Sequence, residues 1–388
     1  MKITQIRTVV VNARMRNWVF VKVETDVDGL HGWGEATLEW KTRAVAGCVE
    51  DLAPLIVGQD PTRIEFLWQI LYRHSFWRTG IIGMSAVSGI EQACWDIFGK
   101  SVGLPVYKLL GGRVRDKVRM YTHLGGGESK SVYESFTSGA VIERALAVKD
   151  RGYSAVKVVC VPYSRPLEGL PPVREFARVM EELREAVGED MDVMVDFHGR
   201  TTTGQAIQYI RAIEDVHPLF CEEPVPPEQT DALAEVRRGV NVPIASGERL
   251  TTRWEFRRLC ELQACHVLQP DLGHCGGLME ARRIASMGET YLMGVAPHNP
   301  NGPIANAAAL HFALSTPNFL IQEDMLGDVP WRFEVVETQM QREAGHWLPL
   351  EAPGLGIEVN ESEAAKHPFQ QETLQQMIFH DDGSVAEW

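Results

Sequence analysis

Acidic and histidine side chains stand at the ends of six short apolar segments in the second part of the sequence. They are Asp196, Glu222, Glu248, Asp271, His298 and Glu323. Successive members lie about 25 residues apart, the length of one strand–helix unit. Because the carboxyl ends of the strands in a parallel barrel meet at one rim, we expect all six side chains to converge there. A single acid at a strand end is commonly a helix N-cap, but capping does not explain six in register.

Three of these groups have the chemistry of metal ligands. Carboxylates that share one pocket repel each other, and a divalent cation removes that repulsion. We therefore predict that Asp196, Glu222 and Glu248 bind a metal ion, and their oxygen-only chemistry favours Mg²⁺, with Mn²⁺ as a substitute, over zinc. Glu223 competes with Glu222, but adjacent strand residues face opposite ways, and Glu222 lies midway between Asp196 and Glu248.

The remaining rim groups suit proton transfer. Asp271 and His298 end neighbouring predicted strands, so the carboxylate can orient the imidazole and make it a stronger base. His198 follows Asp196 by two residues and should face the same side, which makes it a candidate general acid. Lys157 ends an earlier predicted strand, and we interpret it as balancing the negative charge of the site.

Eight short β-rich runs alternate with helical stretches and place these residues. The runs are Val118–Thr122, Ala155–Cys160, Asp192–Asp196, Leu219–Glu223, Val242–Ser246, His266–Asp271, Leu292–Ala296 and Phe319–Glu323. Their almost continuous apolar character is typical of strands that are buried on both faces. Repeated strand–helix alternation predicts a parallel sheet with right-handed crossovers. Eight repeats favour an α/β fold with a modified (β/α)8 barrel over residues 116–353.

The first part of the chain, residues 1–115, is predicted to be an α+β domain that caps the barrel. We expect strands at Ile3–Val11 and Trp18–Glu24, a glycine-punctuated turn at His31–Glu35, and helices at Arg43–Ile56, Pro61–His74 and Met84–Lys100. Residues 354–388 are expected to return across this first domain, and a disordered tail is the alternative.

Composition excludes several classes of protein. The chain has 388 residues, with 38 Lys+Arg against 52 Asp+Glu and a formal net charge of −14, which disfavours a nucleic-acid partner. No apolar run reaches the roughly 18 residues of a membrane span. The seven cysteines lack a framework spacing and are expected to be reduced thiols. No signal peptide is apparent at the first residues, so a cytoplasmic location is predicted.

Nearly the whole chain resembles the enolase superfamily, specifically its mandelate-racemase-like subgroup. The segments that match acid-sugar dehydratases, most closely those acting on galactonate, are Val195–Arg200, Glu222–Pro224, Gly247–Arg249 and Ala296–His298. The resemblance assigns the metal to the three acids named above, the His–Asp dyad to Asp271 and His298, and the acid on the eighth strand to Glu323. Racemases of this subgroup carry Lys-x-Lys on the second strand. Here Val158 and Val159 follow Lys157, so a two-base racemase is disfavoured.

The resemblance implies an Mg²⁺-dependent acid-sugar dehydratase, a hydro-lyase with one ion per subunit and D-galactonate as the leading substrate. The metal stabilises the enediolate, His298 removes the α-proton, and His198 protonates the departing β-hydroxyl. The product is a 2-keto-3-deoxy sugar acid. The implied partners are a small sugar-acid anion and further copies of the chain, with no nucleic acid and no membrane.

Other readings of the sequence stay open. The same scaffold can support an epimerase, a cycloisomerase or a dehydratase of a different aldonate or aldarate, whereas a non-enzymatic scaffold is disfavoured because all six rim groups are present. Loops of the first domain are expected to select the substrate. The predicted substrate contacts are Lys157, Arg200, Trp18 and Trp40, and further candidates are Arg14, Arg16, Glu39, Trp77 and Arg78.

Overall fold

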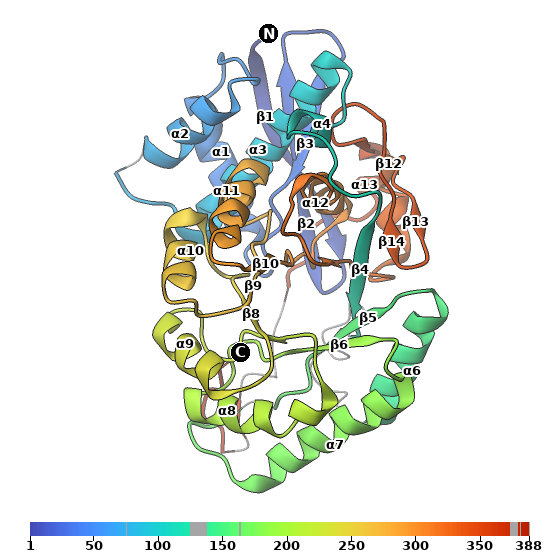
Figure 1. Ribbon diagram of the computed structural model, residues 1–388. Helices are drawn as coiled ribbons and strands as arrows, with labels where there is room; N and C mark the ends of the chain where they lie inside the picture. Colours follow the sequence, from blue (N-terminus) through green and yellow to red (C-terminus); the bar gives the residue numbers. More distant parts are fainter. Residues whose placement is uncertain (75, 125–137, 163, 373–378, 381, 388) are drawn as a thin grey trace.

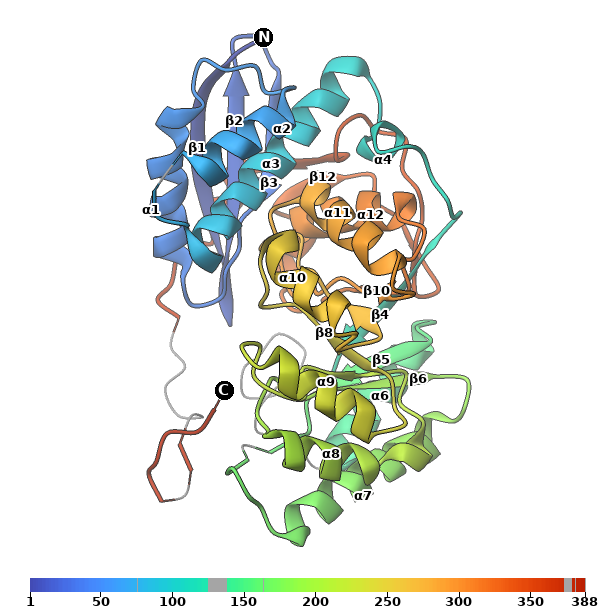
Figure 2. The ribbon, with the colours of Figure 1, turned by 60° about the vertical axis from the view of Figure 1, so that its left-hand side comes forward.

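The computed structural model of the chain describes residues 1–74, 76–124, 138–162, 164–372, 379–380 and 382–387. An antiparallel sheet, ordered β1-β2-β3, opens the chain with β1 (Ile3–Ala13), β2 (Arg16–Thr25) and β3 (His31–Glu35). One face of this sheet is covered by α1 (Thr42–Leu52), α2 (Ile64–Arg73) and α3 (Gly80–Val102) (Figure 2). The short helices η1 (Ala53–Leu55) and α4 (Val106–Leu109) complete this region.

The prediction of a turn at His31–Glu35 is wrong, because this segment is the third strand of the sheet. Its two glycines serve close packing instead of chain reversal. A β carbon on Gly34 would collide with the carbonyl oxygen of Gly89 in α3, and one on Gly32 would collide with that of Ala93. The glycines therefore let α3 lie directly against the strand.

Eight parallel strands of the described residues form the barrel. Seven of the predicted runs contain their strand in full, and the first run, Val118–Thr122, ends one residue short of it. They are β4 (Val118–His123), β5 (Ala155–Val158), β6 (Asp192–Asp196), β7 (Cys221–Glu222), β8 (Ile244–Ser246), β9 (Val267–Leu268), β10 (Gly294–Val295) and β11 (Gln322–Glu323). The strands from β4 to β10 pair in chain order. The ring closes because β11 pairs with β4, and Val295 bridges to Phe319 just before β11.

Helices on the outside of the barrel connect successive strands (Figure 1). They are α6 (Ser138–Asp150), α7 (Leu170–Val187), α8 (Thr203–Arg211), η2 (Glu214–Val216), α9 (Thr230–Gly239), α10 (Thr252–Glu261), α11 (Leu278–Glu289) and α12 (Pro303–Ser315). Strong amphipathic patterning explains α7, whose buried stripe includes Val173, Phe176, Met180 and Leu183. In contrast, α12 is buried along its whole length, including the polar residues Asn306, His311 and Ser315, because it contacts both β3 of the first domain and β4 and α11 of the barrel.

The last part of the chain returns toward the first domain. It contains η3 (Pro330–Phe333), β12 (Val336–Thr338), β13 (Arg342–Glu343), β14 (His346–Trp347), β15 (Ile357–Val359) and α13 (Glu361–Ala364). Glu361 forms ion pairs with Arg7 at 2.6 Å and Lys22 at 2.9 Å, and the Asn12 amide donates to the His367 carbonyl at 2.8 Å. These contacts fix the return segment along the first hairpin.

Two further properties follow from the described residues. No helix among them combines the length and the apolar character needed to cross a bilayer. All seven cysteines lie in the described part of the chain and none forms a disulfide, with Cys48 half-buried and the other six buried.

We predict that Gly34→Ala destabilises the fold by about 1–3 kcal/mol or more, because the added methyl group overpacks the α3 contact. Gly47→Ala in α1 is the matched control, since no atom lies within 4 Å of its added β carbon. That control should gain about 0.5–1 kcal/mol from helix propensity. Thermal midpoints of the two variants measure the difference. A Gly34→Ala protein as stable as the parent would contradict the close approach of α3 to β3.

Candidate active site

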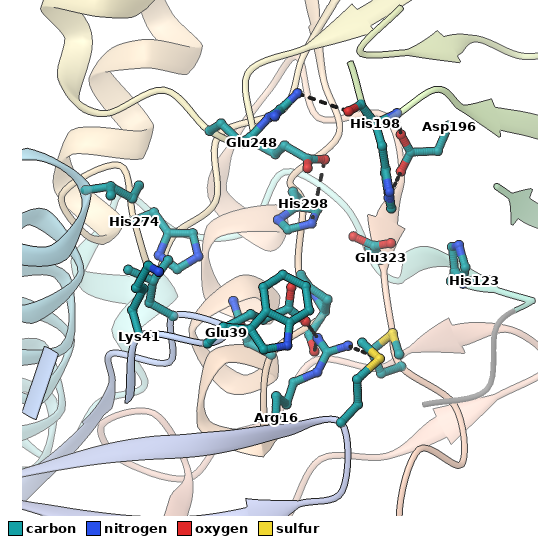
Figure 3. Close-up of a pocket in the computed structure, with 18 of the residues that line it drawn as sticks. Arg16, Glu39, Lys41, His123, Asp196, His198, Glu248, His274, His298 and Glu323 are labelled. Atoms are coloured by element: carbon teal, nitrogen blue, oxygen red, sulfur yellow. Dashed lines mark hydrogen bonds and ion pairs between the residues drawn. The ribbon is translucent and has the colours of Figure 1, made fainter. Parts of the chain in front are cut away.

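A cavity of about 430 Å³ lies at the C-terminal rim of the barrel, beneath loops of the first domain. Rim residues form its floor, and Arg16, Glu39, Trp40 and Lys41 from the first domain form part of its wall (Figure 3). The cavity is the size of a small-molecule site.

Strand alternation explains which side chains enter the cavity. One residue from each strand segment forms an apolar layer inside the barrel, namely Tyr121, Ala155, Met194, Phe220, Ala245, Val267, Ala296 and Ile321. Side chains two residues later face the same way, one layer closer to the rim. On six of the strands this second layer is ionisable, and the other two place Gly247 and Gln269 there; the six are His123, Lys157, Asp196, Glu222, His298 and Glu323. The barrel therefore presents a ring of ionisable groups at its rim, directly above the apolar layer.

Carboxylates of Asp196, Glu222 and Glu248 converge as predicted, with one oxygen from each lying within 4.8 Å of the others. Glu223 is not part of this group, and its Oε2 pairs with Arg249 at 2.7 Å, although its charge still acts on Glu248. The buried Oε2 atoms of Glu222 and Glu248 have no hydrogen-bond partner among the described residues. The unsatisfied oxygens of these two glutamates, beside the Asp196 carboxylate at the end of β6, fit the ligand requirements of a hard divalent cation.

Lys157 supplies the positive charge nearest to these carboxylates. Its buried ammonium lies 2.7 Å from Glu222 Oε1, 3.0 Å from Glu323 Oε1 and 3.5 Å from Asp196 Oδ2. It therefore sits between the acids of β6, β7 and β11. This geometry agrees with the charge-balancing interpretation.

The pKa shifts show that the lysine alone does not balance the carboxylates. Burial and the charge of Asp196 hold the pKa of Glu222 well above its usual value. Burial, with Glu223 and Asp196, does the same for the pKa of Glu248. Burial opposes ionisation of Asp196 too, but His198 and Lys157 outweigh it and lower that pKa. Ionisation of all three neighbouring acids therefore requires a further positive charge, and the triad could hold a metal ion.

The His–Asp dyad is assembled between β9 and β10. His298 Nδ1 lies 2.8 Å from Asp271 Oδ2, and its Nε2 lies 3.6 Å from Glu248 Oε2, so the second nitrogen faces the carboxylate triad. Burial opposes the charged imidazolium, but the Asp271 hydrogen bond and the nearby Glu323 raise the pKa of His298 to about 9. The Asp271 carboxylate also accepts from Gly273 N at 2.6 Å and from Asn301 Nδ2 at 3.0 Å.

His198 lies beside the triad, on the turn that follows β6. Its backbone takes a left-handed φ of 51°, and its amide donates to Asp196 Oδ1 at 2.9 Å. Its Nε2 lies 3.2 Å from Asp196 Oδ2. Figure 3 shows His198 next to Asp196 and His298 next to Glu248, with Glu323 nearby. Two imidazoles thus border one cavity from different strands.

Several predicted substrate contacts line the cavity. Trp40, Arg16 and Glu39 do so together with Lys157. The Arg16 guanidinium pairs with Glu39 at 2.6 Å and donates to the Pro300 carbonyl at 2.5 Å. The tip of the first hairpin therefore touches the loop that follows His298.

Other predicted contacts lie away from the cavity wall. Trp18 is fully buried, stacked on Phe20, because its position in β2 turns the ring into the core. Arg200 is buried and donates to the Val161 carbonyl at 2.8 Å. Trp77 is 77% exposed on the surface. Arg78 bonds the Tyr72 carbonyl, and Arg14 stacks over Trp331.

Two histidines that the sequence interpretation passed over also line the cavity, His123 and His274. His123 is the last residue of β4, one position beyond the predicted run, and it occupies the same layer as Lys157. Extending that run by one residue would have found it. His274 lies three residues after Asp271, in the loop beyond β9, where strand alternation gives no signal.

Known proteins match this chain over its full length. Residues 2–111 match the mandelate racemase/muconate lactonizing enzyme N-terminal domain, and residues 140–363 match the enolase C-terminal domain-like family. Proteins named D-galactonate dehydratase from Pectobacterium atrosepticum and Ralstonia nicotianae are 38% and 39% identical over 395 residues, covering 100% of both chains.

Solved structures agree with this relationship. A mandelate racemase/muconate lactonizing enzyme-like protein from Roseovarius sp. TM1035 superimposes with a TM-score of 0.90 at 36% identity, covering 96% of this chain and 97% of that one. A mandelate racemase/muconate lactonizing enzyme from Sulfitobacter sp. gives 0.88 at 35% identity, covering 95% and 96%. The chain is therefore an enzyme that belongs to the mandelate racemase/muconate lactonizing enzyme family of the enolase superfamily.

Proposed function

We propose that this enzyme is an Mg²⁺-dependent acid-sugar dehydratase, a hydro-lyase with D-galactonate as its leading substrate. The observation that carries the proposal is the meeting of a carboxylate triad, a His–Asp dyad and a second histidine at one cavity. Full-length relatives named D-galactonate dehydratase support the choice of reaction and substrate.

Asp196, Glu222 and Glu248 are the residues that would hold the ion. When bound there, Mg²⁺ would stabilise the negative charge that develops on the substrate carboxylate. Their oxygen-only chemistry favours Mg²⁺ or Mn²⁺ over zinc. Lys157 would contribute a fixed positive charge beside Glu222 and Glu323.

The chain's own groups would carry out the proton transfers. His298 Nε2 takes the α-proton, while Asp271 holds the ring through Nδ1 and stabilises the resulting imidazolium. His198 then gives a proton to the β-hydroxyl, so that the carbon–oxygen bond breaks and water leaves. The enol product tautomerises to the 2-keto-3-deoxy acid. The α carbon–hydrogen bond and the β carbon–oxygen bond are both lost, and no oxidant is needed.

A single base distinguishes this proposal from racemisation. Lys157 is followed by Val158 and Val159, which are buried, so no second lysine enters the cavity from β5. Lys157 itself is bound to two carboxylates within 3.0 Å, an arrangement that keeps an ammonium charged. One imidazole base on one face of the substrate suits elimination better than inversion.

The first domain is proposed to act as a lid that selects the substrate. We retain residues 1–115 as this lid, 116–353 as the catalytic barrel and 354–388 as the returning segment. Arg16, Glu39, Trp40 and Lys41 would face the part of a sugar acid that is distant from its carboxylate. Covering the cavity also excludes water, which strengthens electrostatic interactions within it.

Metal binding should be visible as stability. Adding Mg²⁺ to chelator-treated protein should raise its thermal midpoint, because the ion binds only the folded triad; at 100 times Kd the gain is about 2.7 kcal/mol. Glu248→Gln should lose most of this gain without lowering the metal-free midpoint, since it removes one repelling charge. Glu261→Gln, on the exposed face of α10, is the matched control and should respond like the parent. Absence of any Mg²⁺ effect on the parent protein would refute the site.

The acid and base roles can be separated by isotope exchange. His298→Asn should abolish both dehydration and exchange of the substrate α-proton with D₂O. His198→Asn should abolish dehydration and leave exchange measurable, because α-proton removal comes before hydroxide departure. Proton NMR of the substrate follows both events. Normal dehydration by the His198 variant, or parental exchange by the His298 variant, would show that the role is misassigned.

A panel of aldonates and aldarates tests the reaction itself. We expect Mg²⁺-dependent release of a 2-keto acid, fastest with D-galactonate, detected with a keto-acid reagent. Glu222→Gln should remove most of that activity while the protein stays folded. If the panel yields no keto acid but a substrate changes stereochemistry or cyclises, the dehydratase assignment fails and an epimerase or cycloisomerase takes its place.

A further inference from the structure

Buried side chains of the first domain hold both loops that carry the dyad. Glu91 in α3 accepts from the amides of Leu278 and Met279 at 2.9 Å each, and so caps α11 directly after the Asp271 loop. Glu35 in β3 accepts from the amides of Gly302 at 2.6 Å and Ala305 at 2.9 Å, and so caps α12 directly after the His298 loop. The first domain therefore fixes these loops as well as covering the cavity.

One contact from α3 reaches the dyad through a second histidine. Ser85 Oγ lies 2.8 Å from the Ile81 carbonyl and 2.9 Å from His274 Nδ1, and all of these atoms lie in the interface between α3 and the barrel. A serine hydroxyl has a single proton, which Ser85 donates to the carbonyl because a carbonyl can only accept. In this arrangement Ser85 Oγ accepts from His274, and His274 Nδ1 carries a hydrogen.

The other nitrogen of His274 faces the dyad. Its Nε2 lies 3.6 Å from Asp271 Oδ2, the same oxygen that bonds His298 Nδ1 at 2.8 Å; this contact is an ion pair only when the His274 ring carries hydrogen on both nitrogens. His274 is only 7% exposed and borders the cavity wall next to Lys41 (Figure 3). Asp271 is thus enclosed between two imidazoles, one that would move the proton and one anchored to the first domain.

Within the described ranges, no ion pair joins the carboxylate triad to the first domain. The ion-pair partners of Asp196, Glu222 and Glu248 there are Lys157, His198 and His298, all from the barrel. A change in how the first domain packs on the barrel should therefore act first on the dyad and reach the triad only through the approach of His298 to Glu248.

We propose that His274 is a positioning residue. Together with Ser85, it makes the geometry of the Asp271–His298 dyad depend on how the first domain packs against the barrel. The kinetic part of this inference rests on the proposed function. The structural part, the hydrogen-bond direction from His274 to Ser85, does not depend on it. Small displacements of a base from its reacting atom lower the rate of proton transfer. A side chain that fixes Asp271 can therefore raise that rate without touching the substrate.

The first experiment reads the hydrogen-bond direction in the full-length protein. Nitrogen-15 NMR of histidine-labelled protein identifies which ring nitrogen carries hydrogen, and the His274→Gln spectrum assigns the signal. We expect a protonated Nδ1 on His274, and Ser85→Ala should shift that signal. A His274 ring with an unprotonated Nδ1 overturns the inference, whatever the enzyme's activity.

The second experiment measures kcat, KM and α-proton exchange. His274→Asn keeps a donor near the Nδ1 position but removes the atom beside Asp271, and should lower kcat and exchange by about tenfold or more. KM should change by less than about threefold. His274→Gln keeps a polar nitrogen near the Nε2 position and should recover part of the loss. Ser85→Ala should act in the same direction as His274→Asn.

Controls separate positioning from folding and from substrate contact. Ser101→Ala removes a serine of the same helix that bonds the Phe98 carbonyl at 2.8 Å on the exposed side, and should match the parent. The Mg²⁺-dependent rise in thermal midpoint should persist in all four variants.

Two results overturn the proposal. A rise in KM with unchanged kcat would make His274 a substrate contact. Parental kinetics in both Ser85→Ala and His274→Asn would show that neither residue affects the dyad. A parent protein that dehydrates no acid sugar overturns the proposed function alone, since the NMR result stands separately.

Discussion

Repulsion among buried carboxylates is the constraint on which the rest of the site depends. Asp196, Glu222 and Glu248 approach within 4.8 Å at the rim, and Glu323 adds a fourth acid that shares Lys157 with two of them. One lysine does not neutralise four ionised acids, so the barrel that fixes each strand end holds together groups whose full ionisation requires a further cation, and the triad could hold one. The histidines that border this group are therefore placed in a strongly negative field.

Strand periodicity made much of this arrangement predictable. The apolar runs and their regular spacing predicted all eight barrel strands, the convergence of Asp196 with Glu222 and Glu248, and the pairing of Asp271 with His298. The prediction of a turn at His31–Glu35 failed because packing against a helix, and not the periodicity of the sequence, determines the structure of that segment. The glycines around Trp33 indicate a turn in isolation, and only the approach of α3 explains them as strand residues.

Contacts between distant parts of the chain account for the rest. Ser85 and His274 are separated by 189 positions, and Glu35 and Gly302 by 267, so no local pattern reveals that they meet. For Trp18 a local pattern exists but gives the wrong prediction. An aromatic residue beside a polar turn suggests a binding loop, whereas its position in the strand buries the ring. Composition indicates which residues could bind a sugar acid, but only the fold determines which side chains line the cavity.

The first domain contacts the loop that follows His298 in two ways. Arg16, at the hairpin tip, borders the cavity and donates to the Pro300 carbonyl, while Glu35 holds the amide of Gly302 two residues later. Both contacts lie on the loop that follows His298. In the proposed function, a change in the hairpin that suits a different substrate would therefore also shift the loop that supports His298. The carboxylate triad lies on other strands and meets this loop where His298 Nε2 approaches Glu248 Oε2 at 3.6 Å. Such a change would therefore act first on the proposed base and reach the triad through that contact.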